Sequence, residues 1–275
     1  MKQSDTATVR NLYLDLLKRA LTNWIHGHEE FVSAAPNGLS KLIANMVFPA
    51  GTMLVTPQRF DEQKRENGQD WPVPLLAHTM VGLKRLDNLQ MCIENVITDA
   101  VPGDLIETGV WKGGSTIFMR GALKAYGDSS RRIWVADSFQ GLPPPNPKKY
   151  PADDGDIHHT IETLRVTEEM VRQNFAAYGL LDDKIMFLKG WFRDTLPTAP
   201  IEHLAVIRLD GDMYESTMDA LQNLYKKLSF GGYVIVDDYC IESCRKAITD
   251  FRIANNIKDA IIDIDGTGVF WRRGA

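Results

Sequence analysis

Short apolar segments alternate with amphipathic segments from residue 103 to the end of the chain, and this alternation limits the fold more than any other feature. The apolar segments have the length and composition of buried strands and span residues 105–109, 132–137, 184–188, 204–209 and 233–236. The segments between them repeat apolar residues at helical spacing and span residues 115–126, 168–178, 215–227 and 241–254. This alternation predicts an α/β fold with a parallel sheet that helices cover on both faces.

Two final segments, at residues 260–264 and 268–272, are joined by Asp265-Gly266-Thr267, which is typical of a hairpin connection. We therefore expect a Rossmann-like, mostly parallel sheet of seven strands that ends in an antiparallel hairpin.

Residues 1–100 have a more helical and irregular pattern. Apolar stripes predict one helix over residues 11–25 and another over residues 75–97. The intervening residues 48–71 contain Gly51, Pro57 and Gly68 and predict a long ordered loop, a feature that is usually functional in compact domains. We expect residues 1–100 to form N-terminal helices and an active-site loop, and residues 101–275 to form the core of one compact domain.

The net charge and the distribution of apolar residues argue against several classes of protein. A formal net charge of -5 over 275 residues argues against a nucleic-acid binder, which would normally be basic. The polar start lacks the apolar core of a secretory signal, and no apolar run reaches the roughly 18 residues that cross a bilayer. We expect a cytoplasmic protein that acts on a small molecule, without a nucleic-acid or membrane partner.

The first core strand runs into the glycine-rich segment Glu107-Thr108-Gly109-Val110-Trp111-Lys112-Gly113-Gly114-Ser115, which leads into a helix. Strand, glycine turn and helix form the usual nucleotide-cofactor arrangement, although a tight turn explains the glycines equally well. Asp137 ends the next strand, where a carboxylate accepts hydrogen bonds from ribose hydroxyls; the alternative is a helix cap or surface charge. Glu107 would repel a pyrophosphate but attract a cation, so S-adenosylmethionine suits this turn better than NAD.

Two further strands end in acids, one in Asp210-Gly211-Asp212 and the other in Asp237-Asp238. Because both strands are apolar and buried, these acids should meet at the carboxyl edge of the sheet. Carboxylates that meet there repel one another unless a cation lies among them, and Mg²⁺ prefers oxygen ligands. The alternative is a set of unrelated solvated acids. His158 and His159, in a proline-rich loop near the expected mouth, are candidates for substrate contact without an assigned role.

These motifs together resemble the macrocin O-methyltransferase family, bacterial enzymes that methylate deoxysugar hydroxyls of antibiotics. The resemblance covers roughly residues 75–272 and includes Gly82-Leu83-Lys84-Arg85-Leu86-Asp87-Asn88-Leu89, the segment from Gly103 to Gly114, Val135-Ala136-Asp137-Ser138-Phe139-Gln140-Gly141-Leu142-Pro143, Leu209-Asp210-Gly211-Asp212-Met213-Tyr214 and Val236-Asp237-Asp238-Tyr239. It implies a class I methyltransferase fold and the cofactors S-adenosylmethionine and Mg²⁺. It also suggests a homodimer or a larger homo-oligomer.

The resemblance further implies roles for single residues. Asp210, Asp237 and Asp238 match metal ligands, and Asp212 matches the proposed general base, with Asp210 as the next candidate. The cofactor residues are Met53, Glu107, Gly109, Ser115, Asp137, Ser138, Gly190 and Trp191.

A metal that stabilises the developing alkoxide, together with a carboxylate that takes the proton, would make a sugar hydroxyl a competent nucleophile. Two alternatives stay open at this stage. One is a metal-dependent methyltransferase that acts on a catechol or another phenol, and the other is a non-catalytic binding protein on the same fold.

Overall fold

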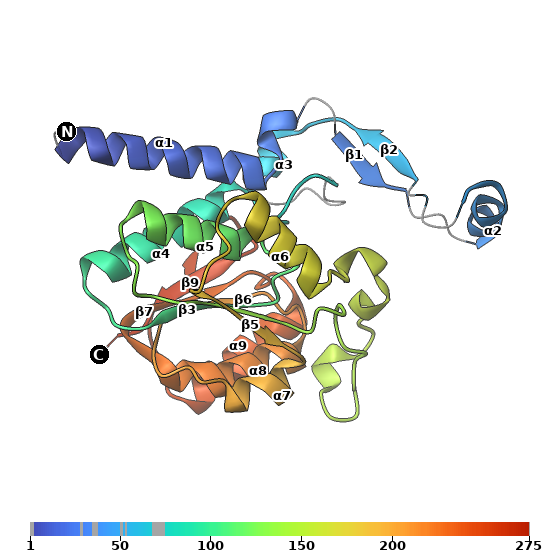
Figure 1. The fold of residues 1–275 in the computed structure, drawn as a ribbon. Coiled ribbons are helices and arrows are strands. Elements are labelled where there is room, and N and C mark those ends of the chain that lie inside the picture. The colour runs from blue at the N-terminus through green and yellow to red at the C-terminus, as the bar shows by residue number, and fades with distance from the viewer. Residues whose placement is uncertain are drawn as a thin grey trace.

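A computed structural model describes residues 3–27, 30–34, 38–49, 52, 54–67 and 75–274. Its core is a seven-stranded sheet in the order β5-β4-β3-β6-β7-β9-β8 (Figure 1). The strands are β3 (Asp104–Thr108), β4 (Ile133–Asp137), β5 (Ile185–Lys189), β6 (Leu204–Leu209), β7 (Leu228–Val236), β8 (Ile262–Asp263) and β9 (Val269–Arg272). The pairs from β5 to β7 are parallel, and β9 is antiparallel to both β7 and β8. The mostly parallel sheet with a closing hairpin is therefore confirmed.

The strand order reverses at β3, because the chain moves outward through β4 and β5 and then returns to β6 on the other side. In open α/β sheets, ligands bind outside the carboxyl ends of the strands at such a reversal. The fold thus directs attention to the residues that follow β3, β4 and β6.

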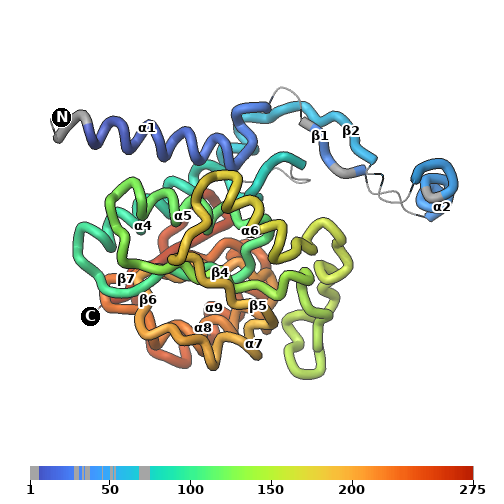
Figure 2. The backbone as a smooth tube through the Cα atoms, viewed as in Figure 1, coloured from blue at the N-terminus to red at the C-terminus, as the bar shows by residue number. Residues whose placement is uncertain are grey.

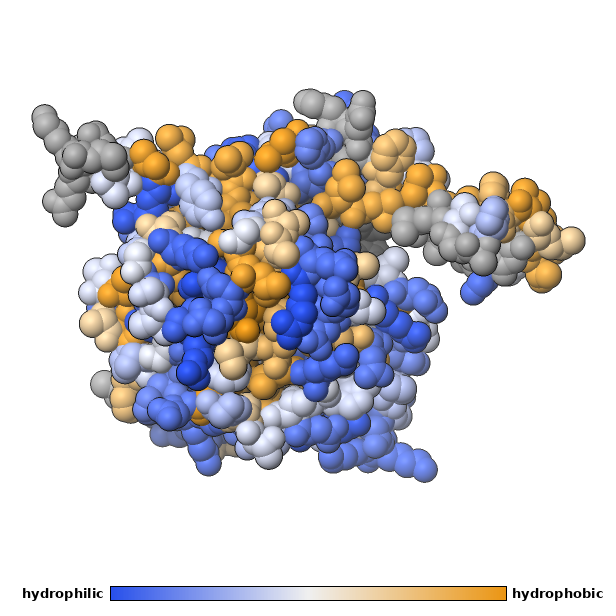
Figure 3. Space-filling view, in the orientation of Figure 1, coloured by the Kyte–Doolittle hydropathy of each residue, from blue (hydrophilic) through white to orange (hydrophobic). Residues whose placement is uncertain are grey.

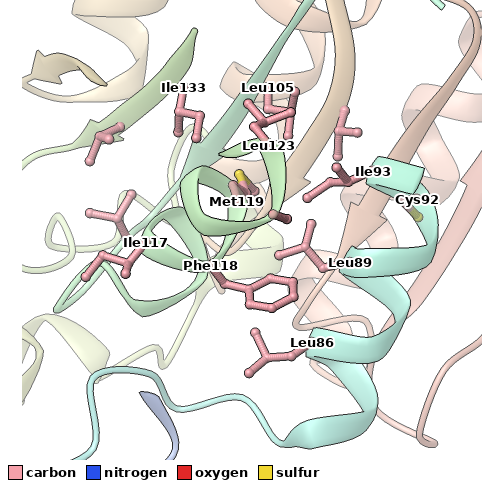
Figure 4. Packing of buried hydrophobic residues seen from close by; sticks show 14 of the residues in the cluster. Leu86, Leu89, Cys92, Ile93, Leu105, Ile117, Phe118, Met119, Leu123 and Ile133 are labelled. Carbon is pink, nitrogen blue, oxygen red and sulfur yellow. The ribbon is translucent and has the colours of Figure 1, made fainter. Parts of the chain in front are cut away.

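Helices cover both faces of the sheet (Figure 1). On one face lie α4 (Leu83–Thr98), α5 (Gly114–Ala125) and α6 (Glu168–Ala177), and on the other lie α7 (Phe192–Thr195), α8 (Tyr214–Leu224) and α9 (Glu242–Ala254). Successive side chains of a strand point to opposite faces of the sheet, so Leu105 packs against the first group of helices and Ile106 against the second. Figure 4 shows the first core, where Leu86 and Leu89 of α4 meet Phe118 of α5.

Short 3₁₀ turns lie between these elements. They span Trp24–His26, Pro151–Asp153, His158–Thr160, Glu162–Leu164, Leu196–Thr198 and Tyr225–Lys227. In the part of the chain that the structure describes, no helix is both long and apolar enough to span a bilayer.

The N-terminal region begins with α1 (Gln3–Leu21), which packs on α5. An arm then extends from the core and carries β1 (Glu30–Ser33), α2 (Gly38–Val47) and β2 (Val55–Gln58) (Figures 1 and 2). The chain returns to the core through α3 (Glu62–Asn67).

Both predicted helices of this region are present, but their bounds differ from the prediction, and the expected loop contains regular structure. The first helix starts earlier and ends earlier than the expected residues 11–25. Residues 48–71, expected to be a loop, include β2 and α3. Strand β2 pairs with β1 alone and is largely exposed, so it has no alternating apolar residues to reveal it.

The helix expected over residues 75–97 begins only at Leu83. The preceding backbone bonds to other segments: Leu75 N–H donates to Phe31 O at 3.0 Å, and His78 N–H donates to Leu21 O at 2.8 Å. His78 O accepts the amide of Gly114 at 2.9 Å. Long-range hydrogen bonds therefore override the helical pattern, and they join the N-terminal region to the glycine turn.

Candidate active site

A cavity with about 750 Å³ of empty space, its open mouth included, lies at the carboxyl ends of β3, β4, β5 and β6. Several predicted site residues line it, namely Gly109, Asp137, Ser138, Gly190, Trp191, Asp210 and Asp212. Glu107 and Ser115 are buried behind this wall and do not line it. Met53 lies outside the described residues.

Gly109 allows two strand ends to come together. Its φ is +86°, and a Cβ at this position would lie 1.7 Å from the backbone oxygen of Asp210. Only glycine fits both the conformation and the space. The sequence left a cofactor-binding turn and a tight turn equally open at this glycine, and the structure adds close approach of the loop that carries Asp210.

Asp137 organises the rim of the cavity. One carboxylate oxygen accepts the amide of Val110 at 2.8 Å, and the other accepts the amide of Phe139 at 2.7 Å. An ionised carboxylate has about four acceptor positions, so these bonds leave capacity for ribose hydroxyls. The side chain thus joins the loops after β3 and β4 and faces the cavity.

The acids that were expected to bind metal lie together. Each of Asp210, Asp237 and Asp238 offers an oxygen, and these oxygens lie within 4.8 Å of one another. Oxygen ligands of Mg²⁺ or Ca²⁺ lie roughly 2.0–2.6 Å from the ion, so two of them can be separated by up to about 5 Å. The spacing and the donor set fit a divalent cation.

Two arginines also enter this cluster, and the sequence analysis missed both. Arg208 of β6, almost fully buried, donates to Glu107, to Asp237 and, at 2.6 Å, to Asp210. Arg85 of α4 donates to Asp237 and, at 2.7 Å, to Asp265. The premise that only a metal could compensate these acids was therefore incomplete. An arginine within an otherwise apolar strand was the available signal, because a charge there needs buried partners.

The two guanidinium groups do not balance the six acids Glu107, Asp210, Asp212, Asp237, Asp238 and Asp265. Burial raises the pKa of Glu107, even though Arg208 opposes the shift. Burial, together with neighbouring carboxylates, also raises the pKa values of Asp210 and Asp238. Oε2 of Glu107 is buried, and no group of the described residues forms a hydrogen bond with it. The cluster thus retains a demand for positive charge, which a divalent cation or a ligand ammonium would meet.

Asp212 has a special backbone position. Its φ is +55°, which is unfavourable for a residue other than glycine. Its amide donates to Asp238 at 3.1 Å, and its carbonyl accepts the hydroxyl of Ser243 at 3.1 Å. Burial raises the pKa of the carboxyl group, and His158 opposes this shift. These contacts hold a strained residue with its side chain at the cavity, which is a common feature of reactive sites.

Several cavity residues had not been singled out from the sequence. They are Met80, Arg193, Glu215, Ser216 and Asp219, among others. Met80 was placed inside a predicted helix that forms only later in the chain. Ser216 and Asp219 are three residues apart on α8, so they share a face, but nothing in the sequence shows which face meets the cavity.

Comparisons with known proteins show which proteins this chain resembles. A family model described as Macrocin-O-methyltransferase (TylF) matches residues 10–273. The 8-demethyl-8-(2,3-dimethoxy-alpha-L-rhamnosyl)-tetracenomycin-C 4'-O-methyltransferase of Streptomyces olivaceus is 53% identical over 271 residues, which cover 98% of this chain and 95% of that protein. The Mycinamicin III 3''-O-methyltransferase of Micromonospora griseorubida is 47% identical over 267 residues, which cover 96% and 97%.

Solved structures are similar as well. The O-methyltransferase NovP superposes with a TM-score of 0.83 at 45% identity, over 97% of this chain and 100% of that one. A calicheamicin methyltransferase superposes with a TM-score of 0.58 at 17% identity, over 96% and 93%, and supports the fold alone.

Proposed function

Because the chain belongs to the macrocin O-methyltransferase family and is therefore an O-methyltransferase, we propose that it uses S-adenosylmethionine to methylate a sugar hydroxyl of a glycosylated natural product. The observation that carries this proposal is a single cavity whose wall includes Asp137 and Gly109 on one side and Asp210 and Asp212 on the other. The related enzyme of Streptomyces olivaceus is named for an acceptor that bears a rhamnosyl group. A catechol acceptor gains no comparable support.

The proposed cofactor contacts follow from the cavity wall. Asp137 binds the ribose hydroxyls, Ser138 and Gly109 form the adjoining rim, and Gly190 and Trp191 flank the adenine. Glu107 acts from behind the wall, where its unpartnered oxygen offers negative charge to the cationic end of the cofactor. Ser115, buried near the start of α5, and Met53 remain predicted cofactor contacts.

Asp210, Asp237 and Asp238 would hold a divalent cation, Mg²⁺ being the expected one. Such a cation stabilises the negative charge that develops on a hydroxyl oxygen during deprotonation. Asp212 takes the proton, a step worth typically 10²–10⁴-fold in rate. The hydroxyl oxygen then bonds to the methyl carbon as the carbon–sulfur bond breaks, and S-adenosylhomocysteine leaves. Asp210 is the alternative base.

The proposal is tested by incubating the enzyme, S-adenosylmethionine and Mg²⁺ with a panel of glycosylated natural products that includes 8-demethyl-8-(2,3-dimethoxy-alpha-L-rhamnosyl)-tetracenomycin-C. Mass spectrometry should show the gain of one methyl group on at least one glycoside. A wild-type enzyme that methylates only a catechol, or nothing, would refute the sugar acceptor.

Metal dependence is tested in the same assay. EDTA should abolish turnover, and added Mg²⁺ should restore it; full activity in EDTA would refute the need for a metal.

The variant Asp212→Asn should lose about 10²–10⁴-fold in kcat, while calorimetry should show that it still binds S-adenosylmethionine. Unchanged kcat would remove Asp212 from the role of base and leave Asp210.

A homodimer or larger homo-oligomer and a cytoplasmic location are also part of this proposal. The exposed apolar face of α2, formed by Leu39, Leu42, Ile43 and Met46, supports the proposed oligomer.

A further inference from the structure

We propose that His158 hydrogen-bonds the acceptor sugar in the active site, and that Asp153 and Asp156, from the same segment of residues 151–160, hold it in position. This inference rests on the proposed function and adds residues that determine which acceptor is bound.

Asp153 anchors the segment to α8. Its carboxylate is buried and accepts the amides of Tyr214 at 2.6 Å and Glu215 at 3.0 Å, the first two residues of that helix. The residue before the helix, Met213, provides no side-chain cap. A carboxylate from a distant loop thus satisfies the open amides at the positive end of the helix. Because Asp212 lies just before this helix, the cap fixes the loop relative to the proposed base.

Asp156 then fixes the ring of His158. Its Oδ1 accepts the backbone amide of His158 at 2.9 Å, and its Oδ2 lies 2.7 Å from Nδ1 of the ring. The carboxylate is nearly buried, whereas the imidazole is about one-third exposed. Nδ1 is therefore committed to Asp156. Within the described residues Nε2 has no hydrogen-bond partner, so it is the atom available to a ligand.

The ring of His158 lies within electrostatic range of Asp212. Burial alone would lower the pKa of His158, but the hydrogen bond with Asp156 and the charge of Asp212 raise it above its ordinary value. The geometry also brings this segment to Asp212, because Asp153 caps α8, which begins two residues after Asp212. A pair so placed can bracket a ligand between an imidazole and a carboxylate.

A sugar has the right chemistry for this bracket. Its reacting hydroxyl must meet Asp212. Because Nδ1–H of His158 donates to Asp156, Nε2 of the neutral ring accepts a hydrogen bond from a neighbouring hydroxyl, whereas Nε2–H of the imidazolium donates to a neighbouring hydroxyl or methoxy oxygen. An acceptor without an oxygen beside the reacting hydroxyl would lose that bond. His158 would thus select for an oxygen-substituted neighbouring position.

The test compares His158→Ala, His158→Gln and the matched control Asp154→Asn, an exposed acid of the same segment. For the glycoside methylated in the panel, His158→Ala should raise KM roughly tenfold or more with a smaller change in kcat, because the lost bond acts in binding. His158→Gln should recover part of the loss, since its amide can reach a similar position. Asp154→Asn and the affinity of every variant for S-adenosylhomocysteine should stay unchanged.

An unchanged KM in His158→Ala, or equal losses in the Ala and Gln variants, would overturn the inference. If the wild-type enzyme methylates no glycoside, the proposed function fails by itself. Calorimetry then decides the inference separately, with 8-demethyl-8-(2,3-dimethoxy-alpha-L-rhamnosyl)-tetracenomycin-C titrated into the enzyme saturated with S-adenosylhomocysteine. No binding by the wild type, or equal binding by wild type and His158→Ala, would refute it.

Discussion

At the scale of single residues, the buried Arg208 shows how much the site depends on paired charge. Its guanidinium contacts Glu107, Asp210 and Asp237, from the ends of three different strands. Removing one partner of a buried ion pair typically costs about 3–5 kcal/mol, because the remaining charges lose their compensation.

We therefore predict that Arg208→Met lowers the free energy of unfolding in urea by roughly 3–5 kcal/mol. The same substitution at Arg245, which is exposed on α9, should leave stability unchanged. Stability of Arg208→Met within about 1 kcal/mol of wild type would mean that the acids are compensated in another way.

Lys112 provides a prediction about pH. Its ammonium donates to Leu75 O at 2.7 Å and Ala77 O at 3.1 Å, and burial lowers its pKa to about 8. In the unfolded chain the pKa is about 10.4, so between these values the unfolded state binds more protons. The free energy of unfolding therefore gains a contribution that grows as the pH rises through this window.

The stability of wild type relative to Lys112→Met should accordingly increase between about pH 7 and pH 10 in urea unfolding. The exposed Lys226 on the 3₁₀ turn Tyr225–Lys227 serves as the control for the same substitution. A difference between wild type and Lys112→Met that is independent of pH would contradict the lowered pKa.

At the scale of elements, the sequence predicted secondary structure correctly where every position of a continuous segment is buried. Strand β6 is buried at every position, so its apolar run marked its bounds correctly. The local sequence pattern does not reveal β1 and β2, because they pair only with each other. It also does not reveal the structure of residues 75–82, because their backbone bonds to Phe31, Leu21 and Gly114 in distant segments.

The same reasoning separates the predictable from the unpredictable parts of the site. Acids at strand ends were found because parallel strands bring their carboxyl ends to one edge. Asp153 and Arg85 were missed because a cap for α8 and a partner for Asp237 come from distant segments, and their spacing in sequence carries no signal.

Gly109 and Gly127 make a matched pair that tests how closely two elements approach. Both have positive φ, +86° and +76°, but only Gly109 has a neighbour that a Cβ would strike, while Gly127 faces open space. Gly127→Ala should cost about 1–2 kcal/mol of backbone strain. Gly109→Ala should cost clearly more, or prevent folding, because β3 and the Asp210 loop must separate. If the two variants lost equal amounts of unfolding free energy and of soluble protein, the backbone around Asp210 would have to move aside at little cost.

At the scale of the whole molecule, α2 lies on an arm away from the sheet, and apolar surface continues along that arm and α1 (Figures 1 and 3). Leu39, Leu42, Ile43 and Met46 are each more than half exposed and follow the spacing of one helical face. An amphipathic helix outside its own core requires another apolar surface, and in the proposed homo-oligomer a second copy of the chain supplies it.

The proposed oligomer therefore depends on this face of α2, and charge placed there should dissociate it. Light scattering after size exclusion should show a lower mass for Leu42→Glu combined with Met46→Glu than for wild type. Lys41→Glu, on the same helix and also exposed, should leave the mass unchanged. Because the described residues of α2 do not line the cavity, the double variant should still bind S-adenosylhomocysteine. A wild-type monomer, or an oligomer that survives the double substitution, would mean that the apolar face of α2 serves another surface.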